Sequence, residues 1–249
     1  MVAIRDIARL DLGYFTMPDR PGDPLSGQAI SVCAYLIRHP RGLFLFDSGF
    51  AKADAATEAH YHPVPWPVGA QLKRMGVRTD EIAALANCHL HFDHSGGNRH
   101  FPNRPIFAQR TEYAAAYQPD YTMPIVVEFA GADYQLLDGE AEFWPGIRVI
   151  STPGHTDGHQ TLIVDTDQGR VALAGQSFNT TSEFAAAQLS WELEGSGWSP
   201  PGRYPDWMGR LEQFEPARVL FAHDVAVWER GARPPQRRRR AARRRTKGM

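Results

Sequence analysis

The sequence is poor in cysteine and contains no long apolar run. Cys33 and Cys88 are the only cysteines, and both lie in apolar stretches, so a disulfide scaffold is excluded and two buried free thiols are predicted. No stretch has the length of a membrane-spanning helix. The N-terminus lacks the apolar core and cleavage site of a secretory signal, so we expect a cytoplasmic protein without membrane insertion.

A serine-hydrolase nucleophile is also missing. The Gly-x-Ser-x-Gly turn that presents such a serine does not occur. Any hydrolytic chemistry in this chain is therefore expected to proceed without a serine or cysteine nucleophile.

Positive charge is scarce outside the C-terminal end. Residues 230–249 hold nine Arg and one Lys with no acidic residue, which leaves 17 basic and 28 acidic residues elsewhere, a net charge near −11. This predicts a folded domain over 1–229 that has no specific nucleic-acid partner. The self-repelling 230–249 tail is expected to be disordered in isolation. Non-specific binding to nucleic acid or to an anionic membrane, and docking on the acidic body of its own or a neighbouring chain, stay open for this tail.

Strand and helix patterns alternate along the chain, which predicts an α/β fold with mixed sheets. We expect two strands joined by a turn in residues 29–50, and a helical turn followed by a strand that runs into a histidine cluster in residues 77–91. A strand and a helix are expected in residues 104–117, three strands in residues 146–176, and a helix followed by a strand in residues 204–224. Residues 50–70 and 118–145 are rich in Pro, Gly and aromatics and are predicted to be long loops.

Three histidines and an aspartate crowd into residues 89–94. An extended backbone would place His89, His91 and Asp93 on one side, with His94 following as the chain turns. Imidazole and carboxylate ligands suit zinc or a similar divalent ion. Four ligands in six residues are difficult to arrange around one tetrahedral ion, so the spacing favours two ions.

Two more histidines follow apolar strands. His155 and His223 are each predicted at the C-terminal end of a strand, where α/β sheets place their sites. On the same alternation of side chains, Cys88 is expected to face away from His89.

Five motifs occur in an order that resembles the metallo-β-lactamase-fold hydrolases, from about Ala29 to Val227. They are "LFDSG" (45–49), "HLHFDHSGGN" (89–98), "TPGHTDGHQ" (152–160), "LAGQ" (173–176) and "FAHD" (221–224). The second and third are most similar to those of the quorum-quenching N-acyl-homoserine lactonases. The resemblance implies a four-layer αβ/βα sandwich with a two-metal site at one edge.

The resemblance also assigns roles to individual residues. It implies one ion held by His89, His91 and His155, and a second held by Asp93, His94 and His223. Asp47 would hydrogen-bond toward these ligands and fix their orientation. His159 is expected to pack structurally behind its loop, and Phe92 to line the floor of the substrate pocket.

The sequence departs from the family at Gln176, where a metal-bridging aspartate is expected. A glutamine carbonyl is neutral and bridges two ions poorly. Three alternatives stay open: two ions bound more weakly, one ion bound firmly and the other partly, or a non-catalytic metal-binding or ligand-sensing module. The six remaining ligands favour the first two readings, with zinc as the expected metal and iron, manganese or cobalt as alternatives.

A second departure concerns the group that stabilises the oxyanion. The tyrosine that the lactonases carry three residues after the bridging aspartate is Asn179 here. Its amide is a candidate oxyanion donor, and Tyr121 and Tyr204 are candidate substitutes. The apolar segments 60–69 and 121–134 are candidates for lining an acyl-chain channel or for a dimer contact, which leaves a homodimer open.

We therefore expect a metal-dependent hydrolase that opens a lactone ring, with N-acyl-homoserine lactones as the expected substrates. A metal-bound hydroxide would attack the carbonyl, and Asp93 would take its proton and pass it to the leaving oxygen. The alternatives are another carboxylic ester or thioester hydrolase of the same fold, or the non-catalytic protein described above. A nuclease is disfavoured by the acidic body.

Overall fold

The computed structural model describes residues 1–119, 121, 124–197 and 203–231. Of the predicted tail over 230–249, all but the first two residues lie outside this part of the chain. Within the described residues, no helix is both long and apolar enough to cross a membrane.

The N-terminal half forms a seven-stranded mixed sheet in the order β4-β1-β2-β3-β5-β6-β7. Its strands are β1 (Ile7–Thr16), β2 (Ala29–His39), β3 (Gly42–Phe46), β4 (Val64–Pro65), β5 (Ile82–Ala86), β6 (Pro105–Gln109) and β7 (Asp133–Leu137). The strands from β3 to β7 are parallel, whereas the β4-β1-β2-β3 part is antiparallel. The helices of this half are η1 (Ile4–Asp6), α1 (Ala55–Tyr61), α2 (Val68–Arg74), η2 (Thr79–Glu81), α3 (Phe92–Ser95), η3 (Asn98–His100), α4 (Arg110–Ala115) and α5 (Pro124–Val127).

The C-terminal half forms a six-stranded sheet in the order β13-β12-β11-β10-β9-β8. Its strands are β8 (Ala141–Trp144), β9 (Ile147–Ser151), β10 (Gln160–Thr166), β11 (Gly169–Leu173), β12 (Arg218–Leu220) and β13 (Val227–Glu229). Among the described strands of this sheet, β11 and β12 pair in parallel and the other neighbours pair antiparallel. Two helices belong to this half, α6 (Thr181–Gly195) and α7 (Met208–Glu212).

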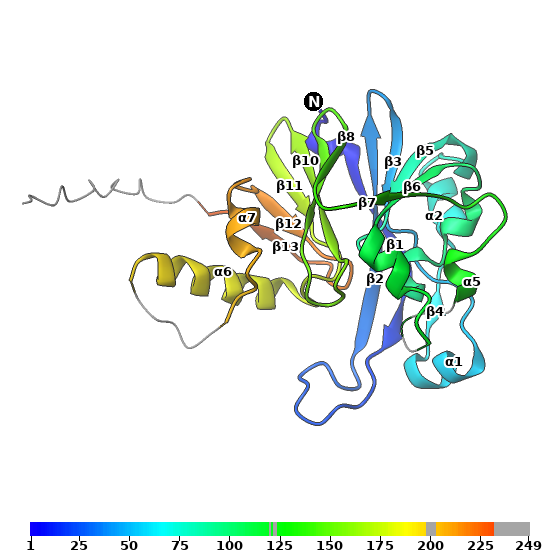
Figure 1. Cartoon of the computed structure of the whole chain (residues 1–249), viewed down its shortest axis with the longest axis horizontal. Helices are drawn as coiled ribbons and strands as arrows, with labels where there is room; N and C mark the ends of the chain where they lie inside the picture. Colours follow the sequence, from blue (N-terminus) through cyan, green and yellow to red (C-terminus); the bar gives the residue numbers. More distant parts are fainter. Residues whose placement is uncertain (120, 122–123, 198–202, 232–249) are drawn as a thin grey trace, which may run out of the picture.

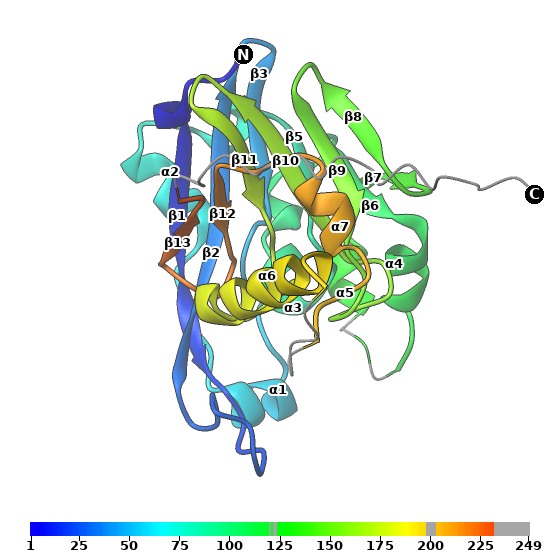
Figure 2. The same ribbon diagram turned by 90° about the vertical axis from the view of Figure 1, so that its left-hand side faces the viewer.

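The two sheets face each other, with α6 and α7 outside one sheet and α2 and α5 on the far side of the other (Figures 1 and 2). Strand β2 shows why the layers hold together. Cys33, Tyr35 and Ile37 join the apolar cluster between the sheets, while the side chains that alternate with them join the cluster under α2. A third cluster packs the second sheet against α6 and α7. The predicted four-layer sandwich with mixed sheets is therefore confirmed.

Most of the predicted strand and helix segments occur as expected, including the hairpin of β2 and β3 and the three strands β9, β10 and β11. The two predicted long loops are wrong. Residues 50–70 contain α1, β4 and the start of α2, and residues 118–145 contain α5, β7 and β8. Four of these elements, α1, β4, β7 and β8, have no buried residue, and α5 is only four residues long, so the apolar alternation that marks a strand or a helix is weak in them.

Candidate metal centre

The candidate ligands gather at one edge of the sandwich because the strands that carry them end there. Strands β3 and β5 are parallel and precede Asp47 and the 89–94 cluster. In the other sheet, β9, β11 and β12 run in one direction and precede His155, Gln176 and His223. The prediction that His155 and His223 follow strand ends is confirmed.

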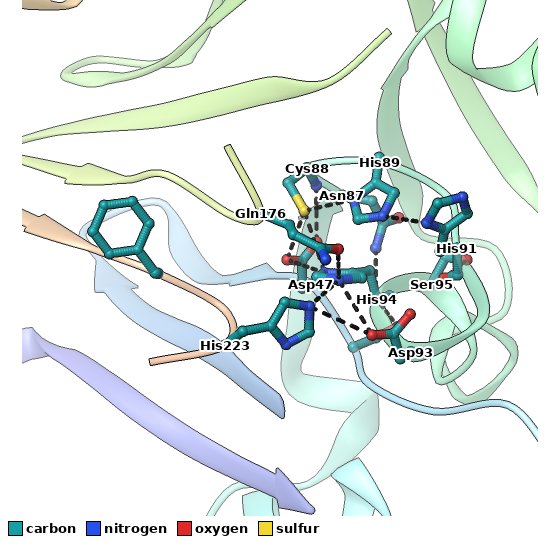
Figure 3. Close-up of polar contacts among 12 residues, drawn as sticks. Asp47, Asn87, Cys88, His89, His91, Asp93, His94, Ser95, Gln176 and His223 are labelled. Carbon is teal, nitrogen blue, oxygen red and sulfur yellow. Dashed lines mark hydrogen bonds and ion pairs between the residues drawn. The ribbon is translucent and has the colours of Figure 1, made fainter. Parts of the chain in front are cut away.

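The 89–94 cluster is not one extended segment. Strand β5 ends at Ala86, and the helical turn α3 begins at Phe92. Asp93 and His94 therefore project from a helix, while His89 and His91 project from the loop before it. The turn, rather than strand alternation, separates the four side chains into two groups (Figure 3).

The first group is formed by three imidazoles. Nε2 of His89 lies 2.9 Å from Nδ1 of His91, and Nε2 of His155 lies 3.1 Å from the same atom. Three ring nitrogens that converge in this way match the His₃ donor set of a divalent ion. We call His89, His91 and His155 the first triad.

The second group combines a carboxylate with two imidazoles. Oδ2 of Asp93 lies 3.4 Å from Nε2 of His94 and 3.6 Å from Nε2 of His223. The two Nε2 atoms are 3.1 Å apart. We call these three residues the second triad; they are a second set able to hold a metal ion.

In the second triad, the ring nitrogens on the opposite side of both histidines are also hydrogen-bonded. Nδ1 of His94 lies 3.1 Å from Oδ2 of Asp47, and Nδ1 of His223 lies 2.8 Å from the Ser31 carbonyl. Such outer contacts fix the tautomer and the direction of a ligating imidazole. Both rings thus keep Nε2 turned toward the centre.

The prediction that Cys88 faces away from His89 is wrong. Its Sγ lies 3.1 Å from Nδ1 of His89, 3.1 Å from Oδ2 of Asp47 and 3.3 Å from Nδ1 of His94 (Figure 3). Strand geometry no longer applies after Ala86, so adjacent side chains need not point to opposite faces. A side chain at Gly175 would collide with Cys88, and glycine also permits the φ of +54° found there. Both cysteines are buried free thiols, as predicted.

Burial keeps most of the histidines neutral. It lowers the pKa of His89 well below the ordinary value, and that of His155 to about 2. The pKa of His91 and that of His223 fall to about 4 for the same reason. Neutral imidazoles offer a lone pair to a metal ion, so these rings are ready to bind one at neutral pH.

His94 and Asp93 behave differently because they face each other. Burial would lower the pKa of His94, but the carboxylates of Asp93 and Asp47 outweigh it and raise that pKa. Burial would raise the pKa of Asp93, but the imidazoles of His94, His223 and His91 lower it. Asp93 is therefore an ionised carboxylate at neutral pH.

Gln176 points into the centre at the second triad. Its Oε1 lies 3.2 Å from Nε2 of His94, so a neutral carbonyl oxygen stands beside the triad. Its backbone N–H donates to Nε2 of His159, 3.1 Å away. His159 is fully buried, and its Nδ1 lies 2.8 Å from Oγ1 of Thr152, so it packs behind the site. Asn179 accepts from Nε2 of Gln176 at 3.2 Å.

A pocket of about 420 Å³ opens onto the metal centre. Its inner wall includes His91, Asp93, His155 and Gln176. The apolar part of its lining is formed by Phe15, Met17, Tyr61, Phe92 and Pro119, and the exposed polar part by Arg20 and Asp54. The candidate donor Asn179 is not in this lining set. The pocket has the size and mixed character typical of a small-molecule site.

Of the remaining residues predicted to line the pocket or to contact the substrate, some line the pocket and others lie elsewhere. Tyr121 lines it, with its ring 4.6 Å from that of His91 and its hydroxyl bonded to Glu112. Tyr204 instead bonds Glu194 and lines a different hollow beside α6. Of segment 60–69, Tyr61 reaches the pocket, whereas several later residues line another hollow near Trp66.

Sequence reasoning missed Glu112, which is 1% exposed in α4. Its Oε1 accepts from the backbone N–H of Leu90 at 3.0 Å. Its Oε2 accepts from the Thr156 hydroxyl at 2.7 Å and the Gly158 N–H at 3.2 Å. Burial raises its pKa, against the effect of these bonds. A lone Glu in an amphipathic stretch gives no signal of this role, because its partners are distant in sequence.

The motif set, the four layers and the two triads together define a class of protein. The sequence model of the metallo-beta-lactamase superfamily matches residues 29–223, so the chain belongs to that superfamily.

Within the superfamily the chain is related to N-acyl homoserine lactonases. It is 40% identical over 159 residues to one from Bacillus thuringiensis, covering 62% of this chain and only 60% of that relative. It is 33% identical over 246 residues to N-acyl homoserine lactonase AttM of Rhizobium johnstonii, covering 83% of this chain and 87% of that one. The chain thus spans about 60% of the first relative's length.

A solved structure gives the same relationship in three dimensions. An N-acyl homoserine lactone hydrolase, with the product N-hexanoyl-L-homoserine bound at its catalytic metal center, superposes with a TM-score of 0.71. The sequence identity is 26%, and the superposition covers 90% of this chain and 94% of that one.

Proposed function

We propose that this protein is a metal-dependent lactonase that opens the ring of N-acyl-homoserine lactones. The observation that carries the proposal is the pair of triads at the inner wall of an open pocket, in a chain related to N-acyl homoserine lactonases. An ester hydrolase of this kind needs no serine nucleophile.

The donor sets suit two divalent ions. The first triad offers three neutral imidazole nitrogens, and the second offers two imidazoles and the Asp93 carboxylate. Borderline ligands of this kind favour zinc. Gln176 would add a neutral oxygen to the second set, in place of an anion that offsets the repulsion between two cations. We therefore propose a second ion that is bound more weakly than the first.

When bound, such ions supply an activated water and positive charge beside the scissile carbonyl. The protein's own groups supply the proton transfer. Asp93 lines the pocket as an ionised carboxylate, so it is suited to accept a proton from the attacking water and return it to the leaving ring oxygen. The side chain of Asn179 accepts a hydrogen bond from Gln176, which lies between it and the second triad. Asn179 could act as oxyanion donor only if these two side chains rearranged.

The pocket's apolar side favours an acyl substituent. Phe15 packs edge-on against Tyr61 with centroids 5.7 Å apart, and Tyr61 packs against Phe92 at 5.7 Å. Phe15 also contacts the ring of His223 at 5.4 Å. A continuous aromatic wall thus leads away from the second triad, and an alkyl chain would gain free energy by covering it.

Proton release on ring opening tests the proposal directly. Metal-reconstituted protein is assayed with short- and long-chain N-acyl-homoserine lactones and with simple γ-lactones. We expect saturable turnover that a chelator abolishes and added zinc restores. Bound metal without turnover of any lactone would overturn the lactonase assignment and favour another ester or thioester.

Replacing Gln176 by Asp separates a working site from a silenced one. If wild type hydrolyses lactones, glutamine is a tolerated ligand, and the substitution is expected to tighten the second ion. Inert wild type together with an active Gln176→Asp variant would identify a non-catalytic metal-binding protein instead.

A further inference from the structure

Glu112 joins the two loops that carry the first triad. Leu90, whose N–H it accepts, lies between His89 and His91. The other carboxylate oxygen accepts from Thr156 and Gly158, which follow His155. These loops belong to different halves of the sandwich, so one side chain of α4 fixes their separation.

The contact leaves little freedom on either side. A side chain at Gly158 would come within 2.5 Å of Cβ and the backbone nitrogen of Glu112, so the loop after His155 lies directly on α4. Glu112 is 1% exposed, and water cannot readily replace the bonds that its carboxylate makes.

The partners of Glu112 are all donors. Each oxygen faces one backbone N–H and one hydroxyl, Tyr121 being the hydroxyl beside Leu90. Only an ionised carboxylate accepts on both oxygens. A glutamine amide would turn its NH₂ toward the N–H of Leu90 or toward that of Gly158, whichever way it is placed.

No corresponding link reaches the second triad. Its outer contacts are made by Asp47, Cys88 and the Ser31 carbonyl, which belong to the first sheet and its loops. Cys88 contacts His89 as well as His94, so it supports both triads, whereas the described hydrogen bonds of Glu112 reach only the loops of the first triad.

We infer that Glu112 is a positioning residue for the first triad alone, and that it sets the affinity of the ion held by His89, His91 and His155. This inference rests on the proposed metal function of the triads. It concerns ion binding rather than hydrolysis, so the two claims can fail separately.

The test measures zinc affinity in full-length protein by competition with a chromophoric chelator. Two backgrounds isolate the triads: His223→Ala leaves the first intact, and His155→Ala leaves the second. We expect Glu112→Gln to weaken zinc binding about 10–100-fold in the first background, as is typical for outer-contact mutations. In the second background we expect a change within about twofold, because Glu112 makes no described hydrogen bond to Asp93, His94 or His223.

Glu183→Gln is the matched control. Glu183 also accepts from two backbone N–H groups, those of Asn179 and Thr180, but on the side of Gln176. The Glu183→Gln substitution should leave the zinc affinity of the first triad unchanged. Equal weakening by Glu112→Gln in both backgrounds, or none in the first, would overturn the inference and reduce Glu112 to a general stabilising role.

Thr156→Val serves if Glu112→Gln does not fold. It removes one donor and keeps the carboxylate, and the expected loss is smaller but again confined to the first triad. A selective loss in a protein that hydrolyses no lactone would support this inference while overturning the lactonase proposal. Absence of zinc binding in the wild-type protein would overturn both.

Discussion

At the scale of single residues, Cys88 occupies a position usually given to a stronger acceptor. A ligating histidine normally donates its second N–H to a carboxylate, a carbonyl or a water molecule. Because Nε2 of His89 faces the first triad, its Nδ1 must carry the hydrogen, and the Cys88 sulfur lies 3.1 Å from it. Sulfur accepts weakly, so the orientation of His89 depends on close packing as well as on this bond.

Replacing Cys88 by Ala should therefore weaken zinc binding at the first triad, by about 10-fold or more. The N–H of His89 would lose its acceptor, and Asp47 would lose the thiol beside it. Cys88→Ser restores a hydroxyl and should recover most of the affinity. Chelator competition measures both variants. Equal affinities for the Ala and Ser variants would show that the side chain acts only by filling space.

The sequence predicts ligands better than it predicts their supports. The six His and Asp candidate ligands occur in short motifs, and the structure brings them together in two groups that could each hold a metal ion. Glu112 and the contacts of Cys88 were not predicted. Glu112 meets Leu90 and Gly158 across 22 and 46 positions of the sequence, and such pairings are set by tertiary packing. The Cys88 error has a local cause, since strand alternation was extended beyond the last strand residue.

At the scale of elements, the start of α6 is tied to the metal centre. Thr180 accepts from the Glu183 N–H at 3.2 Å, and Glu183 accepts in return from Thr180 and Asn179. The N–H of Thr181 donates to Asp224, the neighbour of His223. This capping box thus connects the loop after Gln176 with the loop that carries the last histidine.

Thr180→Ala should destabilise the protein by about 1 kcal/mol because α6 loses its N-terminal cap. For a chain of this size the melting temperature should fall by about 2–4 °C. Ser196→Ala is the control at the other end of the helix, where the hydroxyl donates to the Leu193 carbonyl. Thermal unfolding of the metal-free protein is the measurement. Indistinguishable melting temperatures for the two variants would contradict a special role for the box.

Elements with a strong apolar pattern were predictable, and short ones were not. Strand β2 is buried on both faces, and its long apolar run identified it. In contrast, α1 has no buried residue and β4 has two exposed residues, so composition alone suggested a loop there. Such elements form because the neighbouring sheet supports them, as β1 does for β4.

At the scale of the whole molecule, the two sheets contribute complementary parts of one centre. The seven-stranded half supplies His89, His91, Asp93 and His94, and the six-stranded half supplies His155, Gln176 and His223. Neither triad is complete within one half. Metal binding should therefore stabilise the packing of the sheets against each other, since an ion that binds only the folded state shifts the unfolding equilibrium.

The Arg-rich tail should contribute nothing to this centre. Deleting residues 232–249 removes eight Arg and one Lys, which changes the net charge from −1 to −10. Among the residues that the structure describes, the candidate ligands, both sheets and the pocket lining all lie before the deletion. We expect unchanged zinc affinity and melting temperature in the shortened protein.

Polyanion binding should change in the opposite way. Full-length protein is expected to bind heparin at low salt and to elute as salt rises, because the attraction comes from screened charges on a basic segment. The shortened protein, with its acidic body, should not bind. Heparin chromatography of both forms, with zinc affinity measured in parallel, separates the two properties. Loss of zinc affinity on deletion would instead make the tail part of the folded unit, and heparin binding by the shortened protein would locate the basic surface on the body.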